Sequence, residues 1–228
     1  VGSVTAGKTT SDQLIVDQHW ASREWNIPRA MRTYRFWFLF ASNLLLWGIG
    51  VNLILAHQVA FAVDEGYSSA FGALIFSLYG VLYGLGNLLG GFLSDRVGRE
   101  VAATMGLTLG SLGVLMLILN QGNGTPWLMC TYSLLFGTGN GITSAALTTT
   151  AADLFQGKHF GSIQGLIVMG FGIGGSISPW LGGKIFDVAG TYIPGFCLTV
   201  GALALSAVCL WMAGPRQVRL VAGRAPRA

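Results

Sequence analysis

Charged residues are scarce in this chain. Asp, Glu, Lys and Arg make up only 10% of its 228 residues, whereas hydrophobic residues make up 52% and the mean hydropathy is +0.60. A soluble domain carries about a quarter charged residues, so an ordinary soluble globular domain is excluded. The 34 glycines fit membrane helices, where small residues let neighbouring backbones approach closely. The composition predicts a multi-spanning helical membrane protein.

Cysteine is also rare, and no cluster typical of catalysis or metal binding is visible in the sequence. Cys130, Cys197 and Cys209 lie in apolar runs without metal-type spacing, so we expect buried, reduced thiols. No nucleophile, base and orienting group form a recognisable set. We therefore expect no enzyme, no metal site and no bound cofactor. The net charge of +4 comes from the tails and loops and does not indicate nucleic-acid binding.

Long apolar segments dominate what is present. A hydrocarbon core of about 30 Å needs about 20 apolar residues per helix. Segments that meet this requirement occupy residues 36–62, 69–92, 101–119, 127–151, 160–184 and 191–213. The predicted fold class is an all-α membrane protein, with a six-helix transmembrane bundle over residues 36–213.

The distribution of Lys and Arg predicts the orientation of this bundle, because cytoplasmic segments retain positive charge. With the N-terminus inside, every Lys and Arg except Lys184 falls in an inner segment. We therefore expect an integral protein of the inner or plasma membrane with both termini cytoplasmic. Residues 1–35 would be a cytoplasmic linker and residues 214–228 a basic cytoplasmic tail. Within the linker, residues 25–35 form either a short interfacial helix or an ordinary basic connection.

A charged run separates the second and third apolar segments. Residues 91–99 read G-F-L-S-D-R-V-G-R, and such charges are costly in hydrocarbon, so the run must turn at a membrane surface. The pattern resembles the cytoplasmic loop signature of the major facilitator superfamily of secondary transporters, although Glu100 stands where that family usually has a second base. The resemblance implies that the loop biases the inward/outward equilibrium, and a charged turn that only fixes topology is the alternative. The residues concerned are Gly91, Asp95, Arg96, Gly98 and Arg99.

A second pattern lies in the fifth apolar segment. Gly165, Gly174, Pro179, Gly182 and Gly183 follow the order G-x8-G-x3-S-P-x2-G-G. This resembles the glycine-proline motif that facilitator antiporters carry in the fifth helix of their first half. The present helix would be the second-half counterpart, so antiport does not follow from it. A hinge in a thin helix and close packing alone are both consistent with the pattern.

Two further stretches resemble one subgroup of this superfamily. Residues 57–66 and 152–161 look like sequences of monocarboxylate and oxalate/formate-type facilitators, and residues 25–213 resemble helices seven to twelve of such a protein. The resemblance implies one half of a major facilitator fold, completed by an N-terminal six-helix half or by a second copy of the chain. Anion carriers of this subgroup often place a cation in the eighth or eleventh helix. Here the matching segments contain no Lys or Arg before Lys184, which argues against a dicarboxylate such as oxalate.

Polar residues inside the apolar segments mark the expected substrate pathway, since such groups usually face the bundle interior or a water-filled path. The first, second, fourth and fifth segments carry amides, tyrosines and one histidine, whereas the third and sixth carry only small hydroxyls. This split matches the facilitator plan, in which the third and sixth helices of each half are peripheral. The predicted pathway residues are Asn43, His57, Tyr79, Tyr83, Asn87, Asn140, Ser144 and Gln164.

Helical spacing refines the first segment. At 100° per residue, Asn43, Gly50 and His57 share one stripe and Asn52 points the opposite way. His57 titrates near neutral pH, so it serves either proton coupling or an interhelical hydrogen bond. Asp64 is expected to cap or anchor the outer end.

The leading functional hypothesis is half of a secondary active transporter embedded in the lipid bilayer. It would move a small organic solute, a mono- or dicarboxylate-type anion, by alternating access with proton coupling (symport) or exchange (antiport). One alternative is a non-transporting truncated scaffold or remnant half. Another is an ATP-driven carrier that would rest on Gly2–Thr9, which matches G-x-x-x-x-G-K-[ST]. That loop requires a strand, a helix and an α/β domain, which are not predicted here, so we interpret the match as coincidence.

Overall fold

The computed structural model describes residues 14–221, which are almost entirely helical. An isolated antiparallel bridge joins Ile15 to Arg219. The helices in chain order are α1 (Gln18–Ala21), α2 (Ile27–Met31), α3 (Tyr34–Asn43), η2 (Leu44–Val51), α4 (Asn52–Asp64), α5 (Ser69–Val97), α6 (Arg99–Asn120), α7 (Pro126–Leu154), α8 (Phe160–Ala189), α9 (Ile193–Ala213) and η3 (Pro215–Gln217).

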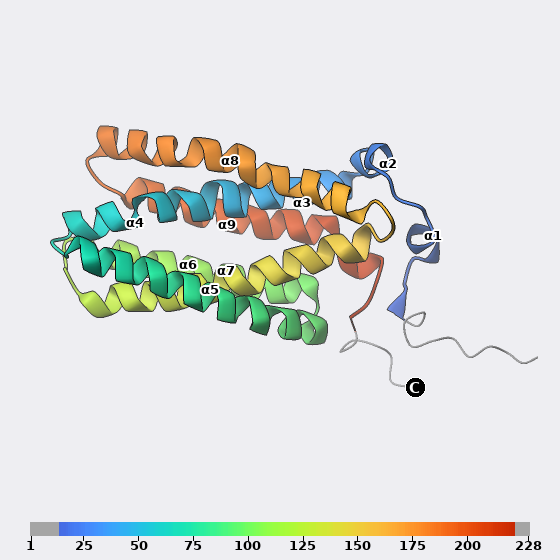
Figure 1. Cartoon of the computed structure of the whole chain (residues 1–228), viewed down its shortest axis with the longest axis horizontal. Coiled ribbons are helices and arrows are strands. Elements are labelled where there is room, and N and C mark those ends of the chain that lie inside the picture. Colours follow the sequence, from blue (N-terminus) through green and yellow to red (C-terminus); the bar gives the residue numbers. More distant parts are fainter. Residues whose placement is uncertain (1–13, 222–228) are drawn as a thin grey trace, which may run out of the picture.

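Six long rods form one elongated bundle (Figure 1). The first rod is the continuous run α3–η2–α4, and α5 to α9 are the others. Five rods are long and apolar enough to cross a membrane, namely Tyr34–Asp64, Ser69–Val97, Arg99–Asn120, Phe160–Ala189 and Ile193–Gln217. The predicted all-α membrane class is therefore confirmed. The sixth rod, α7, has 29 residues but is not among those five, so its place in the bundle rests on length and packing rather than on hydropathy.

Local sequence signals explain where these helices begin and end. Ser68 caps α5 by accepting a hydrogen bond from the Phe71 backbone N–H at 3.1 Å. Pro126 begins α7, at a position where no intrahelical N–H bond is needed. Gly190 and Gly214 adopt the left-handed conformation that ends α8 and α9.

The six rods form two three-helix sets that pack against each other. The first rod, α5 and α6 form the first set, and α7, α8 and α9 form the second. α5 and α6 pack on α7, the first rod of the second set, while α8 and α9 pack on the first rod of the first set. α6 and α9 also contact one another. Successive rods run in opposite directions, so the two sets are inverted relative to each other (Figure 1). This nesting is the inverted-repeat organisation of facilitator halves.

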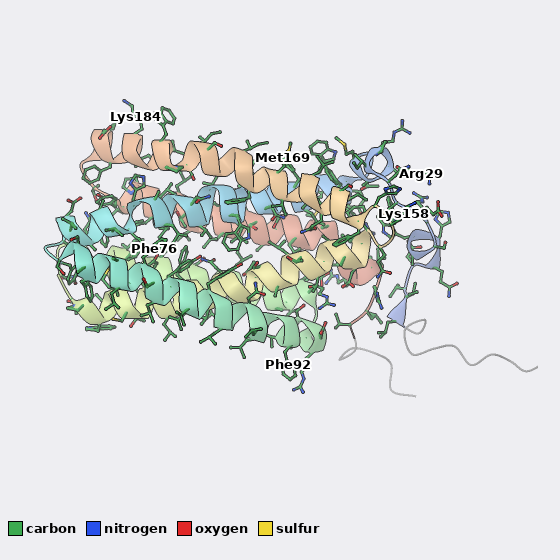
Figure 2. The ribbon with its side chains drawn as sticks, viewed as in Figure 1. Arg29, Phe76, Phe92, Lys158, Met169 and Lys184 are labelled. Carbon is green, nitrogen blue, oxygen red and sulfur yellow. The ribbon has the colours of Figure 1, made fainter. Side chains whose placement is uncertain are left out.

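The outer surface of the bundle is apolar. Phe76 on α5 and Met169 on α8, both labelled in Figure 2, are 44% and 53% exposed. Cys130 and Cys197 are also exposed, so the expectation of buried thiols was wrong for these two. The physical reason is that a surface solvated by lipid tails does not have to bury its apolar side chains.

The first rod departs from a regular α-helix. Its central eight residues, η2, are π-helical, with more residues per turn than an α-helix. The expected stripe assumed a constant 100° per residue across this stretch, and that assumption was wrong. His57 and Asn52 both approach α8, within 2.6 Å and 2.7 Å of the positions that Cβ atoms would occupy on Gly182 and Gly175. Asn52 therefore lies on the α8 side, as His57 does, and the expected opposite facing of Asn52 is not observed.

Candidate functional site

The two ends of the bundle differ in charge. Every described Lys and Arg except Lys184 lies near the end that carries α1, α2 and η3, here called the basic end. Figure 2 shows Arg29 and Lys158 at this end and Lys184 at the opposite one. Asp64, Glu65 and Asp187 lie at that opposite end, here called the acidic end.

A cavity of about 310 Å³ opens between α3–η2, α5, α7 and α8. It brings together four of the eight predicted pathway residues and adds Trp47 and Thr148, which the sequence reasoning missed. A tryptophan in an apolar run and one threonine among many carry no signal that distinguishes them. The cavity is lined by Asn43, Trp47, Tyr83, Ser144, Leu147, Thr148, Gln164, Val168 and Phe171.

Hydrogen bonds and ring contacts fix the polar wall of this cavity. The Tyr83 hydroxyl donates to Ser144 Oγ at 3.0 Å, and Trp47 packs edge-on against the Tyr83 ring, with centroids 5.5 Å apart. Asn43 Nδ2 donates to the Leu39 carbonyl at 3.0 Å. Gln164 Oε1 is buried and accepts no hydrogen bond from any residue of the described range 14–221. An unsatisfied buried acceptor costs about 1–3 kcal/mol, so a donor that reached this oxygen would lower that cost.

The other four predicted pathway residues lie outside the cavity lining. Tyr79 is buried and stacks on Tyr83, with ring centroids 6.3 Å apart. Asn140 is fully buried in α7, and neither of its side-chain polar atoms has a hydrogen-bond partner within residues 14–221. Asn87 is half-buried on α5. These three residues extend from the wall into the helix packing behind or beside it, and their role in a pathway stays a prediction.

His57 occupies a slot against α8. Its Nε2 lies 2.9 Å from the carbonyl oxygen of Pro179. The carbonyl can only accept, so Nε2 is the donor in this hydrogen bond. Gly182 and Gly183 leave room for the imidazole, and a Cβ on Gly182 would stand 2.6 Å from Nε2. This geometry is the interhelical hydrogen bond weighed above, and proton coupling through His57 stays a prediction.

The remaining motif glycines of α8 differ from each other. Gly174 crosses Gly48 of η2 so closely that a Cβ on Gly174 would lie 2.6 Å from the Gly48 Cα. Gly165 has open space beside it in the described part of the chain, so it does not serve close packing there. Pro179 lies within a continuous α8, without an end to the helix at that point. Packing therefore explains Gly174, and hinge motion at Pro179 stays a prediction.

The charged run at the basic end is mostly helical. α5 continues to Val97, and only Gly98, with φ 103° and ψ 152°, separates it from α6. The predicted loop over residues 91–99 was therefore too long. A side chain at Gly98 would be strained in this conformation, which explains the glycine. The helix persists because Arg99 Nη1 reaches back to Asp95 Oδ1 and to Ser94 Oγ, both at 2.6 Å.

Arg99 also reaches a partner that the sequence reasoning did not identify. Its Nε donates to Asp153 Oδ2 of α7 at 2.8 Å, and Arg219 Nη1 lies 4.0 Å from Asp153 Oδ1. Arg96, in contrast, stacks over the Phe92 ring at 4.0 Å. The signature residues thus tie α5, α6 and α7 together at one end of the bundle.

Glu100, the departure from the family pattern, has its own partner. Its side chain is buried and accepts from the Arg216 backbone N–H at 3.2 Å, with Arg216 Nε 4.0 Å away. The positive charge of Arg216, which lies in η3, therefore offsets the negative charge of Glu100. A long-range pair of this kind leaves no local mark in the sequence.

The described part of the lead-in packs onto the basic end. Trp20 Nε1 donates to the Leu154 carbonyl at 2.7 Å, and Trp25 is only 3% exposed. Arg35 stacks over Trp20 at 4.5 Å and donates to Gln217 Oε1 at 3.1 Å. The structure divides residues 25–35 between α2 and the start of α3. Residues 1–13 and 222–228, including the Gly2–Thr9 motif, lie outside the described range.

Hydrogen bonds also connect helix ends at the acidic end. The Tyr192 hydroxyl donates to Asp64 Oδ2 at 2.7 Å, as the expected anchoring role of Asp64 would require. Burial and the adjacent carboxylate raise the pKa of Tyr192 above its ordinary value. Glu65 accepts from the Gly122 backbone N–H at 2.6 Å. These contacts join the ends of α4, α6 and α9.

An apolar helical bundle with inverted three-helix sets, and a cavity between them that both polar and apolar side chains line, defines a multi-spanning helical membrane protein. The chain belongs to the Major Facilitator Superfamily, whose family model matches residues 36–227. The predicted family is therefore confirmed.

Relatives and solved structures agree with this assignment. The chain is 26% identical over 190 residues to monocarboxylate transporter 12-B of Danio rerio, covering 80% of the chain and 40% of that protein. It is 32% identical over 136 residues to a probable sulfoacetate transporter of Cupriavidus necator, covering 53% and 30%. A crystal structure of the peptide transporter POT with sulfate shares the fold, with a TM-score of 0.69 and 20% identity over 84% of this chain and 40% of that one. The chain thus spans less than half the length of these proteins.

Proposed function

We propose that this chain forms one six-helix half of a secondary transporter and that its cavity is one wall of the substrate path. Facilitator sites lie near the bilayer midplane between two halves. The cavity draws polar groups from four rods, and the observation that carries the proposal is that Gln164, which lines it, has a buried Oε1 without a hydrogen-bond partner in the described residues. A permanent unpaired acceptor would only destabilise the fold, whereas a transient partner satisfies it.

The proposed substrate is a small organic anion of the monocarboxylate or dicarboxylate type. Relatives bear the names monocarboxylate, sulfoacetate and anion transporter, which supports this class. The cavity residues are all uncharged, so this wall would offer hydrogen bonds and no ion pair. A positive charge for the carboxylate would then come from the opposite wall.

An N-terminal six-helix half is the proposed source of that wall. α5 and α8 flank the cavity, and only 22% of each span's apolar window is buried, compared with 50%, 44% and 39% for the other three apolar spans. A partner packed against α5 and α8 would cover this surface. A second copy of the chain is the alternative occupant. The positive charge of the basic end supports placing it in the cytoplasm.

The signature residues are proposed to control alternation between inward and outward states. The ion pairs of Arg99 with Asp95 and Asp153 hold three helix ends together at the basic end. Breaking or remaking such contacts changes the relative stability of two conformations. Coupling to protons or to an exchanged solute would supply the energy.

The test is reconstitution in liposomes. The chain alone and the chain co-expressed with a candidate N-terminal six-helix half would be assayed for uptake of labelled monocarboxylates under imposed pH gradients. Uptake only by the paired halves supports the proposal. Uptake by the chain alone would indicate a dimer of copies. No uptake with either preparation, despite correct insertion, would favour the non-transporting remnant, and uptake that requires ATP would favour the ATP-driven carrier.

A further inference from the structure

Two adjoining hollows lie at the basic end, away from the cavity. One, of about 510 Å³, is lined by Arg23, Arg29, Arg32 and Thr33. The other, of about 400 Å³, is lined by Ala21, Arg23, Glu24, Trp25, Gln156, Gly157, Lys158 and His159. Arg23 belongs to both. Arg29 and Lys158, one from each hollow, both lie at this end of the bundle in Figure 2.

The four cationic side chains of these hollows have no carboxylate partner within residues 14–221. Arg23, Arg29, Arg32 and Lys158 make no ion pair with a carboxylate in residues 14–221, and Glu24 is the single acid among the lining residues. Arg99, Arg216 and Arg219 at the same end all have carboxylate partners. A concave surface with several unpaired cations attracts anions strongly.

The backbone around these cations is held in place. Asn26 Oδ1 caps α2 by accepting from the Arg29 backbone N–H at 3.0 Å, and Arg29 Nη1 donates to the Glu24 carbonyl at 3.0 Å. Arg23 lies 5.5 Å from the centre of the buried Trp25 ring. The guanidinium groups are thus partly pre-positioned, which lowers the entropy cost of binding.

The same segment also carries a lipid-facing side. Met31, Tyr34 and Trp37 are 39%, 54% and 49% exposed. Trp37 Nε1 donates to the Met31 carbonyl at 2.8 Å, which ties this apolar group to α2. Exposed Trp and Tyr at the start of a spanning helix lie at headgroup level. The adjoining arginines therefore stand at the depth of lipid phosphates.

We propose that the two hollows bind the headgroup of an anionic phospholipid of the adjacent leaflet, with Arg29 and Arg32 on one phosphate and Arg23 and Lys158 on a second. Guanidinium forks match phosphate oxygens in paired hydrogen bonds. A lipid with two phosphates fits both hollows, and two singly charged lipids fill them less tightly. The site does not depend on the transport activity proposed above, since it requires only that the chain lies in a membrane.

The experiment titrates the purified full chain in a zwitterionic detergent with diphosphatidylglycerol, phosphatidylcholine or inorganic phosphate, and measures bound lipid by native mass spectrometry. Diphosphatidylglycerol should bind at least about tenfold more tightly than phosphatidylcholine, since each interfacial cation adds roughly 1 kcal/mol. Arg29→Gln should weaken this binding by about fivefold. Lys184→Gln, which removes the same charge at the acidic end, should leave it unchanged.

Three results would overturn the proposal. Equal binding of both lipids would mean that the headgroup charge is not recognised, and equal losses in Arg29→Gln and Lys184→Gln would mean a non-specific charge effect. Inorganic phosphate at millimolar concentration that displaces the lipid fully would indicate a soluble anion site. Lys158→Gln, which lies outside α2, provides the same test if Arg29→Gln does not fold. Failure of uptake in the liposome assay leaves this lipid measurement unaffected.

Discussion

Arg99 Nε donates to Asp153 Oδ2 across 2.8 Å and so joins the first turn of α6 to the last turn of α7. Both side chains are largely shielded, with 13% and 11% exposure. Charged hydrogen bonds of this kind are stronger than exposed ion pairs. The contact links a residue of the charged run to one that lies 54 positions later in the chain.

Asp153→Asn should lower the transport rate by about tenfold, because the contact is proposed to set the balance of inward and outward states. Substrate affinity should change by less than about twofold, since Asp153 does not line the cavity. Initial uptake rates and equilibrium binding of a labelled substrate would be measured side by side. Glu24→Gln, at the same end but without an ion pair in the described residues, is the control. A parallel loss of affinity would contradict the gating role.

Asp95→Asn should act in the same direction but more weakly. Asp95 is 62% exposed on its side chain, and exposed ion pairs contribute about 0–1 kcal/mol. We therefore expect a rate reduction of about two- to fivefold, with affinity preserved. The double variant with Asp153→Asn would show whether both carboxylates act through Arg99. Purely additive effects would mean that they act independently.

Gln164→Ala should weaken substrate binding by about tenfold, because it removes a polar side chain that lines the cavity and whose Oε1 has no hydrogen-bond partner within residues 14–221. The free protein should lose no stability through lost hydrogen bonds of Oε1, which makes none within residues 14–221. Binding would be followed by competition with a labelled monocarboxylate, and stability by thermal unfolding. Ser176→Ala, on the exposed side of the same helix, is the matched control. Equal affinity in both variants would exclude Gln164 from the site.

Gly86→Ala should destabilise the bundle by about 1–3 kcal/mol, the usual cost of forcing atoms into a packed interface. A Cβ on Gly86 would collide with the backbone of Thr138 on α7. Gly84→Ala on the same helix meets open space in the described structure, so it should be neutral or stabilising by about 0.5–1 kcal/mol. Thermal unfolding in detergent compares the two. A destabilising Gly84→Ala together with a harmless Gly86→Ala would refute the packing of α5 on α7.

The membrane class, the apolar spans and the charge difference between the two ends could be predicted from the sequence alone. Each of these is a local property, since a lipid-facing helix needs a run of apolar residues and charges must stay at its ends. The weakest span by hydropathy was α7, and the structure explains why: it packs against both α5 and α6, so polar groups such as Asn140 are covered by protein.

Which polar residues come into contact with each other could not be predicted from the sequence, because it depends on how the helices pack. Asn43, Tyr83, Ser144 and Gln164 share one cavity, whereas His57 pairs with Pro179, and no helical spacing distinguishes these outcomes. The π-helical turn of η2 changes the facing of every later residue in the first rod, and regular 100° spacing cannot register it. Asp153 contacts Arg99, and Arg216 contacts Glu100, because helix packing brings these distant residues together. Hydropathy is a property of each segment of the chain and can be read from its sequence. A site is a set of contacts between distant segments, and those contacts depend on how the helices pack.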